Sequence, residues 1–587
     1  MTSALKTRWS EKINKDCPLA EYPRPQLVRK NWSCLNGQYD YAITASEAET
    51  PVDYDGKILV PFSFESALSG VRKPLMPDSC LWYRRFFSLD ESFNDKNAIL
   101  HFGAVDWQCR VYINGKPVGE HTGGYCAFFF DITAFLKTGE NELVVRVYDP
   151  TDAGWQQRGK QVMNPRGIWY TATSGIWQTV WLEPVDSCYI HKIKLLPDID
   201  TSTIQITTTI TAGAQADNTL IKAIVCENGK QIISQEITCN ASITIPNLRL
   251  WSPESPFLYD LHLELYKDGT LCDCVESYFG MRKFSVAMDS SSIPRLFLNN
   301  KPYFQNGLLD QGYWSDGLLT PPSDEAMIYD IQSMKDLGFN MLRKHIKIEP
   351  LRWYYHCDRL GMIVWQDMIS GGAYIGNFLA GVLPILGIHV KDNDYKRFKR
   401  SNPAAREQFK SELFEMIEGL YNTVSIGCWV PFNEGWGQFD AKEIAGAVMV
   451  YDSSRVVDHA SGWHDQGGEQ LQSVHRYIFP VKRPKPDARP FVLSEFGGYS
   501  RVVSGHVWNI KKCFGYRMFK DEASLTKAYK KLMERQIIPL VKKGLSATVY
   551  TQVSDVENEV NGILTYDREI MKLDAHTVKA LNEKLVL

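Results

Sequence analysis

VSIGCWVPFNEGWG, residues Val424 to Gly437, is the stretch from which the fold can be predicted. Its apolar run ends at Val430, and a polar pair, Asn433 and Glu434, follows shortly after. A short apolar run rich in Val, Ile and Trp is typical of a strand covered on both faces, as in a parallel sheet. Residues just past the carboxyl end of such a strand face the mouth of a parallel barrel, where chemistry occurs. The stretch therefore predicts a buried barrel strand that delivers a carboxylate.

A second stretch has the same design. PFVLS, Pro490 to Ser494, is another short apolar run, and Glu495 follows it directly, before Phe496 and two glycines. A glutamate after a strand is most often a surface residue or part of a helix start, so either one alone would say little. Two carboxylates at strand ends of one barrel favour paired acid chemistry.

The pattern beyond residue 290 alternates between strands and helices. Met327, Ile331 and Met334 recur at helical spacing after Ser323, a plausible helix N-cap. Two long segments, 369–401 and 499–524, interrupt the alternation and are expected to shape a site or an interface. Eight strand-like runs predict a (β/α)8 barrel over 287–587, namely 303–307, 339–344, 362–367, 424–430, 455–459, 471–475, 491–494 and 545–552.

Residues 1–184 predict an all-β domain. Asn114-Gly115 lies between two strand-like runs and is a strong hairpin signal, because both turn residues need positive φ. Short strands separated by turn signals favour a sandwich. The tryptophans of this region could stack on a sugar, but aromatic side chains mostly bury area, so we expect core or loop packing for Trp107, Trp155 and Trp169.

Residues 185–286 predict a second β-sandwich, with a sequence pattern different from that of residues 1–184. Leu261, Leu263 and Leu265 alternate with polar residues, which is the period of a half-buried antiparallel strand. About one hundred residues of short alternating strands suggest an immunoglobulin-like fold. We expect this domain to act as a spacer without chemistry of its own.

The composition is that of an ordinary soluble protein, with 44% hydrophobic and 23% charged residues. A net charge of −3 gives no electrostatic footprint for nucleic acid or for an anionic membrane. The N-terminus has no apolar signal region, and no apolar run of about 18 residues occurs, so we expect a cytoplasmic protein unless a leader has been removed. Thirteen scattered cysteines do not form a disulfide framework and are expected to be reduced thiols.

The two acidic motifs resemble those of a known enzyme family. Asn433-Glu434 and Ser494-Glu495-Phe496-Gly497 are similar to the acid/base and nucleophile motifs of glycoside hydrolase family 2, which includes β-galactosidases, β-glucuronidases and β-mannosidases. The resemblance extends over nearly the whole chain. It implies a jelly-roll sugar-binding domain, an immunoglobulin-like sandwich and a catalytic TIM barrel, with Glu434 as the acid/base and Glu495 as the nucleophile.

Further site residues follow from the same resemblance. Asn433 is the neighbour whose amide can bond the sugar's 2-hydroxyl, and Tyr477 is the tyrosine that orients the nucleophile. Arg343 is expected to contact the nucleophile and keep it ionised, because arginine stays charged. Its segment, Arg343-Lys344-His345, is one residue shorter than the family's Arg-x-x-His.

The remaining candidates are expected to bind substrate. His345 could touch a sugar hydroxyl or pack behind the site, Asp310 and Asp367 suit substrate binding and structural caps equally, and Trp463 could stack on a sugar face. At the eighth strand the family often has a tryptophan, whereas this chain has Tyr550-Thr551-Gln552. The substrate-binding candidates therefore comprise Asn433, Arg343, His345, Tyr477, Asp310, Asp367, Trp463, His475 and Gln552.

The resemblance implies a retaining exo-β-glycosidase that hydrolyses terminal neutral β-linked sugars by double displacement, with a β-galactosidase-like enzyme as first choice. Residues 364–367, VWQD, resemble the β-mannosidase branch, which stays an alternative. A transglycosidase would share every catalytic residue, and a non-catalytic carbohydrate-binding scaffold would not need both glutamates. A carbohydrate is the expected partner, and a homo-oligomer is possible.

Metal and cofactor motifs are missing from the sequence, which has no His-Glu-x-x-His, Cys-x-x-Cys, Walker loop or Gly-x-Gly-x-x-Gly. Hydrolysis by two carboxylates requires no cofactor. Some relatives hold magnesium or sodium near the site, but no ligand set is recognisable here, so the metal stays unknown.

One segment bears on the choice of sugar. Family members that act on uronides resemble one another in an Asn-x-Lys pair before a Gly-Ile-Phe-Thr-like segment, and this chain has Glu559 and Asn561 before Gly562-Ile563-Leu564-Thr565. A glutamate replaces the amide and an amide replaces the cation, so a uronate would meet a like charge. We expect neutral hexosides to be preferred over glucuronides by at least roughly a hundredfold in kcat/KM.

Overall fold

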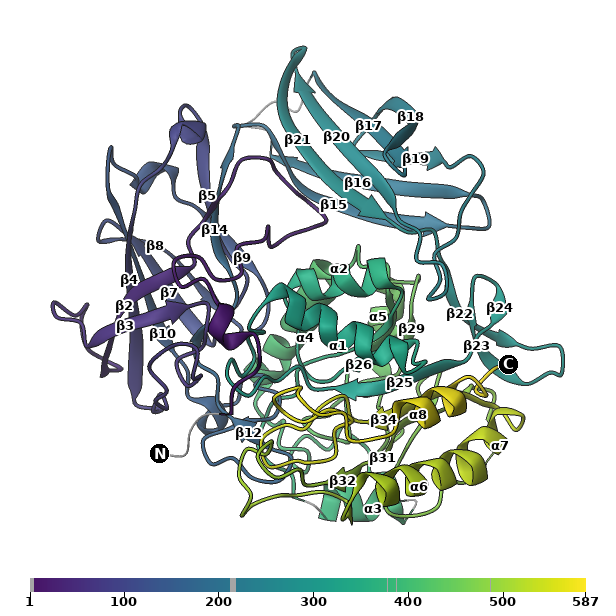
Figure 1. The fold of residues 1–587 in the computed structure, drawn as a ribbon. Coiled ribbons are helices and arrows are strands. Elements are labelled where there is room, and N and C mark those ends of the chain that lie inside the picture. Colours follow the sequence, from purple (N-terminus) through teal and green to yellow (C-terminus); the bar gives the residue numbers. More distant parts are fainter. Residues whose placement is uncertain (1–4, 212–217, 377, 387, 486) are drawn as a thin grey trace.

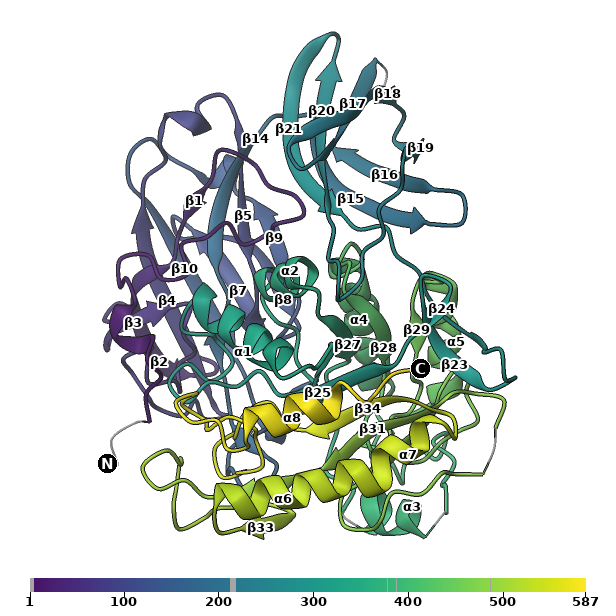
Figure 2. The same ribbon diagram turned by 45° about the vertical axis from the view of Figure 1, so that its right-hand side comes forward.

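The computed structural model describes residues 5–211, 218–376, 378–386, 388–485 and 487–587. Figure 1 shows two β-rich bodies beside and above a third that contains most of the helices. We call them the N-terminal β body, the middle sandwich and the barrel. Figure 2, turned by 45°, shows the middle sandwich standing clear of most of the barrel.

The N-terminal β body consists mainly of two sheets around one apolar core. Its hairpin between β7 (Gln108–Ile113) and β8 (Lys116–Thr122) is the predicted one, with φ of 50° at Asn114 and 75° at Gly115. The six-stranded sheet also contains β2 (Gly37–Ala45), β3 (Gly56–Val60), β4 (Ser79–Phe87) and β10 (Asn141–Tyr148). The second sheet contains β1 (Ser33–Cys34), β5 (Asn97–Phe102), β9 (Phe128–Asp131) and β14 (Val180–Val185).

The middle sandwich packs a three-stranded sheet against a four-stranded one. The predicted alternation is confirmed, because Leu261, Leu263 and Leu265 are buried while the residues between them are partly exposed. One sheet contains β15 (Tyr189–Asp198), β16 (Thr203–Thr211) and β19 (Asn240–Thr244). The other contains β17 (Thr219–Glu227), β18 (Lys230–Ile237), β20 (Tyr259–Lys267) and β21 (Thr270–Phe279).

The barrel is built on a curled sheet of eight strands in the order β29-β28-β27-β26-β25-β34-β31-β30, with every pair parallel. This order is the cyclic order of a TIM-like barrel opened between its fifth and sixth strands. All eight strands lie at their predicted places, as β25 (Gln305–Asp310), β26 (Met341–Lys344), β27 (Ile363–Asp367), β28 (Ile426–Val430), β29 (Val456–Val457), β30 (Gln472–Arg476), β31 (Phe491–Gly497) and β34 (Leu545–Thr551). A small sheet of β22 (Phe284–Met288), β23 (Pro294–Leu298) and β24 (Lys301–Pro302) precedes them.

Helices follow most barrel strands. They are α1 (Asp324–Asp336), α2 (Leu351–Leu360), α3 (Leu383–Ile385), α4 (Pro403–Gly419), α5 (Ala441–Tyr451), α6 (Glu522–Leu532), α7 (Ile538–Val541) and α8 (Ala575–Asn582). The expected alternation fails after β29 and β30, where the described residues form no helix. Gly462 and Gly467 adopt positive φ in the first of these connections, and Pro480 and Pro484 stand in the second, so neither suits a helix.

One loop of the N-terminal β body, residues 154–173, reaches the barrel; we call it the overhanging loop. It contains β11 (Gln161–Val162) and β12 (Tyr170–Thr171), and Figure 1 shows β12 low against the barrel. The Gly159 amide donates to the Ser370 carbonyl (2.9 Å), and the Tyr170 hydroxyl donates to Glu559 (2.5 Å). The loop therefore lies over the carboxyl ends of the barrel strands.

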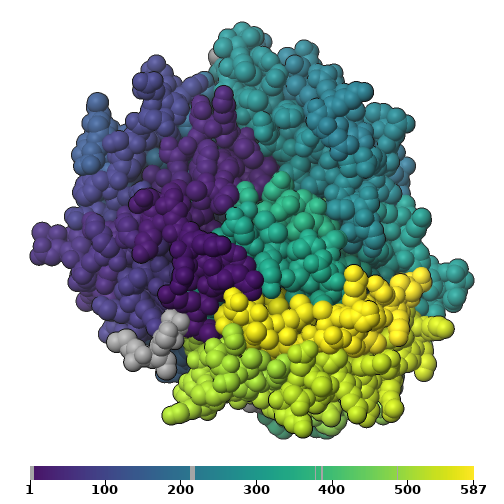
Figure 3. Space-filling view, viewed as in Figure 1, coloured from purple at the N-terminus to yellow at the C-terminus, as the bar shows by residue number. Residues whose placement is uncertain are grey.

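The N-terminal segment also contacts the barrel. Figure 3 shows it, in dark purple, against the teal and yellow surface of the barrel helices. The Thr7 amide and hydroxyl both donate to Asp316 at 2.7 Å. Among the described residues, no helix combines the length and apolar character needed to span a membrane. The thirteen cysteines are free.

Candidate active site

The two predicted acids lie together at the carboxyl ends of their strands. Glu434 follows β28 and Glu495 lies in β31, and their side chains are buried, with 8% and 3% exposure. One oxygen of each carboxylate, together with a ring nitrogen of His475, falls within 4.8 Å of the others. Glu434 adopts φ of 52°, a conformation that few non-glycine residues adopt. The fold thus brings two strand-end carboxylates into one small space.

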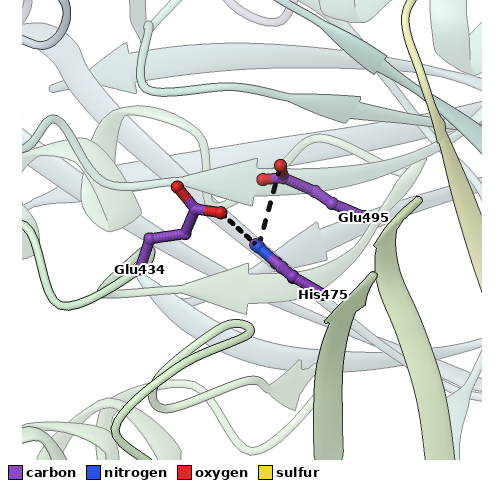
Figure 4. A group of neighbouring side chains, drawn as sticks. All are labelled: Glu434, His475 and Glu495. Carbon is purple, nitrogen blue, oxygen red and sulfur yellow. Dashed lines mark hydrogen bonds and ion pairs between the residues drawn. The ribbon is translucent and has the colours of Figure 1, made fainter. Parts of the chain in front are cut away.

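His475 of β30 lies between the two acids (Figure 4). Its Nδ1 is 2.8 Å from Glu434 Oε1 and 3.7 Å from Glu495 Oε2. Its Nε2 faces Arg343 Nη1 at 3.5 Å, and a guanidinium can only donate. Burial lowers the pKa of His475 to about 4, so the ring is neutral near pH 7. The proton therefore sits on Nδ1, which donates to Glu434.

Arg343 connects the acids to the rest of the barrel mouth. Its side chain is fully buried and donates to Glu495 (3.2 Å), Asp367 (2.9 Å) and Asn433 (2.9 Å). Since arginine stays protonated, it places a fixed positive charge beside Glu495. The structure thus brings Arg343 and Asn433 to the acid pair, as the sequence predicted.

Tyr477 contacts the second acid directly. Its hydroxyl donates to Glu495 Oε2 and lies 3.0 Å from Thr551 Oγ1. Burial raises the pKa of Tyr477 well above its usual range, so the hydroxyl keeps its proton. Its ring stacks on Tyr516 with 4.1 Å between centroids. Glu495 is therefore held from two sides by donors, one charged and one neutral.

Glu434 has an environment suited to a proton donor. Burial raises the pKa of Glu434 to about 7, although the charges of Lys160 and Arg343 oppose the shift. Lys160 belongs to the overhanging loop, so a cation of the N-terminal β body acts on an acid of the barrel. A carboxyl that titrates near neutral pH can give and take a proton in one reaction cycle.

The structure separates the other candidates into two groups. His345 Nδ1 lies 2.7 Å from Asp367 Oδ2, and burial lowers the pKa of His345 well below its usual range. These two side chains adjoin Arg343 and hence the acid pair. Asp310 instead accepts from Lys344 Nζ (2.7 Å) and from the Gly312 amide (2.9 Å), which matches the structural alternative.

Trp463 lies near the acid pair, whereas Gln552 bonds to other residues. The Trp463 ring is half-buried, and its centroid is 6.1 Å from that of His475. Gln552 donates to Asn561 Oδ1 (2.7 Å), and the Asn561 amide in turn donates to Glu559 (2.8 Å). Gln552 thus helps to hold the segment that contains Glu559.

Several residues near the acids were not predicted. Trp436, two positions after Glu434, interacts with it through its side chain and favours its ionised form. Its ring packs edge-on to Trp169 (5.2 Å between centroids) and parallel to Tyr374 (5.3 Å). Trp169 was expected only to pack, and no local signal distinguished it. Trp436 lies within the stretch Val424 to Gly437. Its position just after the strand-end acid Glu434 could have indicated that it lies in the site.

One group of side chains could hold a metal ion, and it coincides with the acid pair. Glu434, His475 and Glu495 are the only group of three ligand-type side chains close enough for one ion among the described residues. Both carboxylates would then be occupied by the ion. The same atoms are the ones required for paired acid chemistry, which needs no ion.

Two family models match the first half of the chain. Residues 12–184 match the glycosyl hydrolases family 2 sugar-binding domain, and residues 188–282 match a second model named glycosyl hydrolases family 2. A β-galactosidase of Thermoanaerobacter pseudethanolicus is 29% identical over 71% of this chain and 54% of its own length. A putative β-glucuronidase of Formosa agariphila is 24% identical over 72% of this chain and 51% of its own length. The chain thus aligns with about half the length of these relatives.

Solved structures share the fold. The β-D-glucuronidase of Dictyoglomus thermophilum superimposes with a TM-score of 0.74 over 96% of this chain and 99% of that one, at 16% identity. The β-glucuronidase of Bifidobacterium dentium gives 0.73 over 95% and 98%, at 18% identity. At these identities the likeness concerns the fold alone.

Proposed function

We propose that this chain is a member of glycoside hydrolase family 2 and a retaining exo-β-glycosidase that releases terminal neutral β-linked sugars. The observation that carries the proposal is the pair of buried carboxylates, with oxygens of Glu434 and Glu495 within 4.8 Å. Retaining enzymes place their two carboxyl groups about 5 to 5.5 Å apart, whereas inverting enzymes need about 6.5 to 9.5 Å to admit a water. The close approach of one oxygen from each group fits the narrower, retaining arrangement, which is the basis on which we propose double displacement.

The proposed reaction assigns one role to each acid. Glu495, which accepts from Arg343 and Tyr477, attacks the anomeric carbon, while Glu434 gives its proton to the leaving oxygen. The glycosidic bond breaks and an ester between the sugar and Glu495 forms. Glu434, now a carboxylate, takes a proton from water, whose oxygen displaces Glu495. Both acids then return to their first state.

The neighbouring groups support this division of labour. Asn433 is oriented by Arg343 Nη2 and can bond the sugar's 2-hydroxyl, a contact that strengthens as charge develops at the anomeric centre. His475 donates to Glu434 and holds its carboxyl group in place. His345 and Trp463 adjoin this centre and are proposed to contact the sugar.

The proposed preference for neutral sugars rests on Glu559. This carboxylate is 2% exposed, accepts from Tyr170 and Asn561, and acts electrostatically on Glu434. A uronate placed beside it would meet a like charge. A β-galactosidase-like specificity is our first choice, and a β-mannosidase-like one is the alternative. Relatives are named both β-galactosidase and putative β-glucuronidase, so a glucuronide belongs in the test.

The test combines a substrate panel with stereochemistry. Aryl β-galactoside, β-mannoside, β-glucoside, β-fucoside and β-glucuronide are compared by kcat/KM, and proton NMR follows the first-formed sugar. We expect a neutral β-anomer first and at least roughly a hundredfold discrimination against the glucuronide. A first-formed α-anomer would exclude double displacement. A glucuronide cleaved as well as the best neutral sugar would overturn the proposed specificity.

The same panel addresses the other classes. With an acceptor alcohol present, transfer product in excess of free sugar would favour a transglycosidase, and no turnover of any glycoside would favour a binding scaffold. We further propose that residues 1–184 form a jelly-roll domain, 185–286 an immunoglobulin-like domain and 287–587 a closed (β/α)8 barrel. A cytoplasmic location and a homo-oligomeric state are proposed on the sequence alone.

A further inference from the structure

A small cavity of about 110 Å³ lies between the overhanging loop and the barrel. Two of its walls are aromatic, Trp169 from the loop and Tyr374 from the long segment after β27. The remaining walls are polar or small, namely Asp152, Arg158, Val162, Asn164 and Arg166.

Arg158 is a buried cation without a carboxylate partner. Its side chain is 8% exposed, and its guanidinium donates only to the carbonyls of Gly159 (3.4 Å), Gln161 (3.2 Å) and Gly372 (3.3 Å). Its Nε has no hydrogen-bond partner, and no ion pair within 4.0 Å reaches it, among the residues that the structure describes. A buried charge is costly unless an opposite charge compensates it. The charge of Asp152 acts on this arginine from beyond ion-pair distance and compensates it in part, so a directly bound anion would be favoured.

Two more cations lie on the same loop. Arg166 is exposed and lines the cavity, in a tight turn closed by hydrogen bonds between Arg166 and Trp169. Lys160 lies two residues after Arg158, and its charge acts on Glu434. The one acid of the cavity wall, Asp152, is engaged through Oδ1 by the Met163 amide (3.0 Å). Three cations thus lie on this part of the loop, while its other end contacts Glu557 and Glu559 of the barrel through Thr171 and Tyr170.

The cavity adjoins the acid that would protonate the leaving group. Trp169 and Tyr374 both pack on Trp436, and the Trp436 side chain acts on Glu434. One aromatic ring thus separates the cavity from the proton donor. Because Glu434 acts on the leaving oxygen, the group that continues beyond that oxygen points to this side of the mouth.

We propose that the cavity is a leaving-group subsite that binds an anionic substituent, a carboxylate or a sulfate, on the part of the substrate that is released. The terminal sugar stays neutral, and the sugar or aglycone next to it carries the charge. Arg158 and Arg166 bind the anion, and Trp169 stacks on the ring that bears it. This inference rests on the proposed function and adds the class of leaving group.

The test uses a series of aryl β-glycosides of the best neutral sugar. Their leaving groups are 4-(carboxymethyl)phenol, 4-(sulfomethyl)phenol and the uncharged 4-(carbamoylmethyl)phenol, which are similar in size and reactivity. We expect an anionic member to exceed the amide by about tenfold in kcat/KM, mainly through a lower KM, because a charge-assisted hydrogen bond is gained. The anionic glycoside with the higher kcat/KM shows whether the subsite prefers a carboxylate or a sulfo group. The preference should shrink as NaCl rises from about 0.1 to 1 M, since screening is stronger.

Variants locate the preference. Arg166→Gln should abolish most of the ratio of anionic to amide substrate, and Arg158→Lys should reduce it, because lysine keeps the charge but not the planar fork. Asp152→Asn should raise it. Arg110→Gln, an exposed arginine on β7 that pairs with Glu120, is the matched control and should keep the wild-type ratio.

The outcomes separate the two proposals. Equal kcat/KM for the amide and both anionic glycosides would overturn the subsite while leaving the glycosidase intact. A preference for the anionic glycosides that persists in both Arg166→Gln and Arg158→Lys would also overturn the subsite proposal. Another part of the protein would then bind the anion. Failure to cleave even the amide glycoside would overturn the glycosidase proposal itself, and the subsite with it.

Discussion

At the scale of single residues, Glu434 owes its proposed role to its surroundings. It is buried, it receives a hydrogen bond from His475, and a cation of another body of the molecule acts on it. Burial favours the protonated form, and the two cations Lys160 and Arg343 favour the ionised form. The balance leaves the pKa of Glu434 at about 7.

This balance gives a prediction on pH. Since the acid form of Glu434 is lost as pH rises through about 7, kcat/KM for a glycoside with a poor leaving group should fall above that pH. Lys160→Met removes a charge that favours the ionised form, so the pKa should rise and the alkaline limb should move to higher pH. The exposed Lys116→Met serves as control. An alkaline limb that stays in place or moves down in Lys160→Met would contradict the assignment.

The two acids should respond differently to substitution. Glu495→Gln removes the nucleophile and should abolish turnover of every substrate. Glu434→Ala should slow a glycoside with a poor leaving group by about 10² to 10⁴-fold but spare one with an activated leaving group such as 2,4-dinitrophenol, which needs no proton. Steady-state rates with the two substrates check this. Near wild-type turnover by Glu495→Gln would exclude it as nucleophile.

At the scale of elements, the sequence predicted the barrel strands and some helices well. Runs such as Ile426–Val430 are apolar because both faces of the sheet are covered, and that pattern is local. The same holds for α1, where Ser323 accepts from the Ala326 amide as an N-cap should. The absence of helices after β29 and β30 was not predicted, because eight strands imply a regular alternation of strands and helices. The glycines and prolines in these two connections are the local signal against a helix.

The N-cap of α1 offers a test of stability. Ser323→Ala leaves the Ala326 amide without its acceptor and should destabilise the protein by about 1 kcal/mol. Ser333→Ala, inside the same helix, should be neutral or slightly stabilising, since alanine has the higher helix propensity. Urea unfolding of both variants checks this. Equal midpoints for the two variants would show that the cap contributes nothing.

The site was predicted less completely than the strands. Glu434, Glu495, Asn433 and Arg343 stand at strand ends, so their convergence follows from the barrel itself. The contacts of the overhanging loop could not be predicted, because they join residues far apart in sequence; the Tyr170 to Glu559 bond spans 389 positions. Asp310 also stands at a strand end, so its position alone would place it in the site. Its hydrogen bond with Lys344 is what distinguishes it from the site residues.

At the scale of the whole molecule, that bond fastens the N-terminal β body to the barrel. Tyr170→Phe would leave a buried oxygen of Glu559 without its donor, at a cost of about 1 to 3 kcal/mol, and should lower the thermal midpoint and raise KM. Tyr529→Phe is the matched control, because the Tyr529 hydroxyl is buried with no partner among the described residues. It should leave both quantities unchanged or improve stability. An unaltered midpoint in Tyr170→Phe would mean that the contact does not fasten the two bodies.

The overhanging loop also has an evolutionary consequence. The two acids and the cations that face the departing group are encoded in separate stretches of the chain, although Tyr170 of the loop packs into the core of the barrel. Changes at exposed positions of this loop, such as Arg166, can therefore retune which compounds are accepted, whereas changes at Lys160 or Tyr170 would also reach Glu434 or the barrel. Exchanging this loop between homologues should transfer preference while preserving reaction type, which makes the loop a natural unit of diversification and a practical one for engineering.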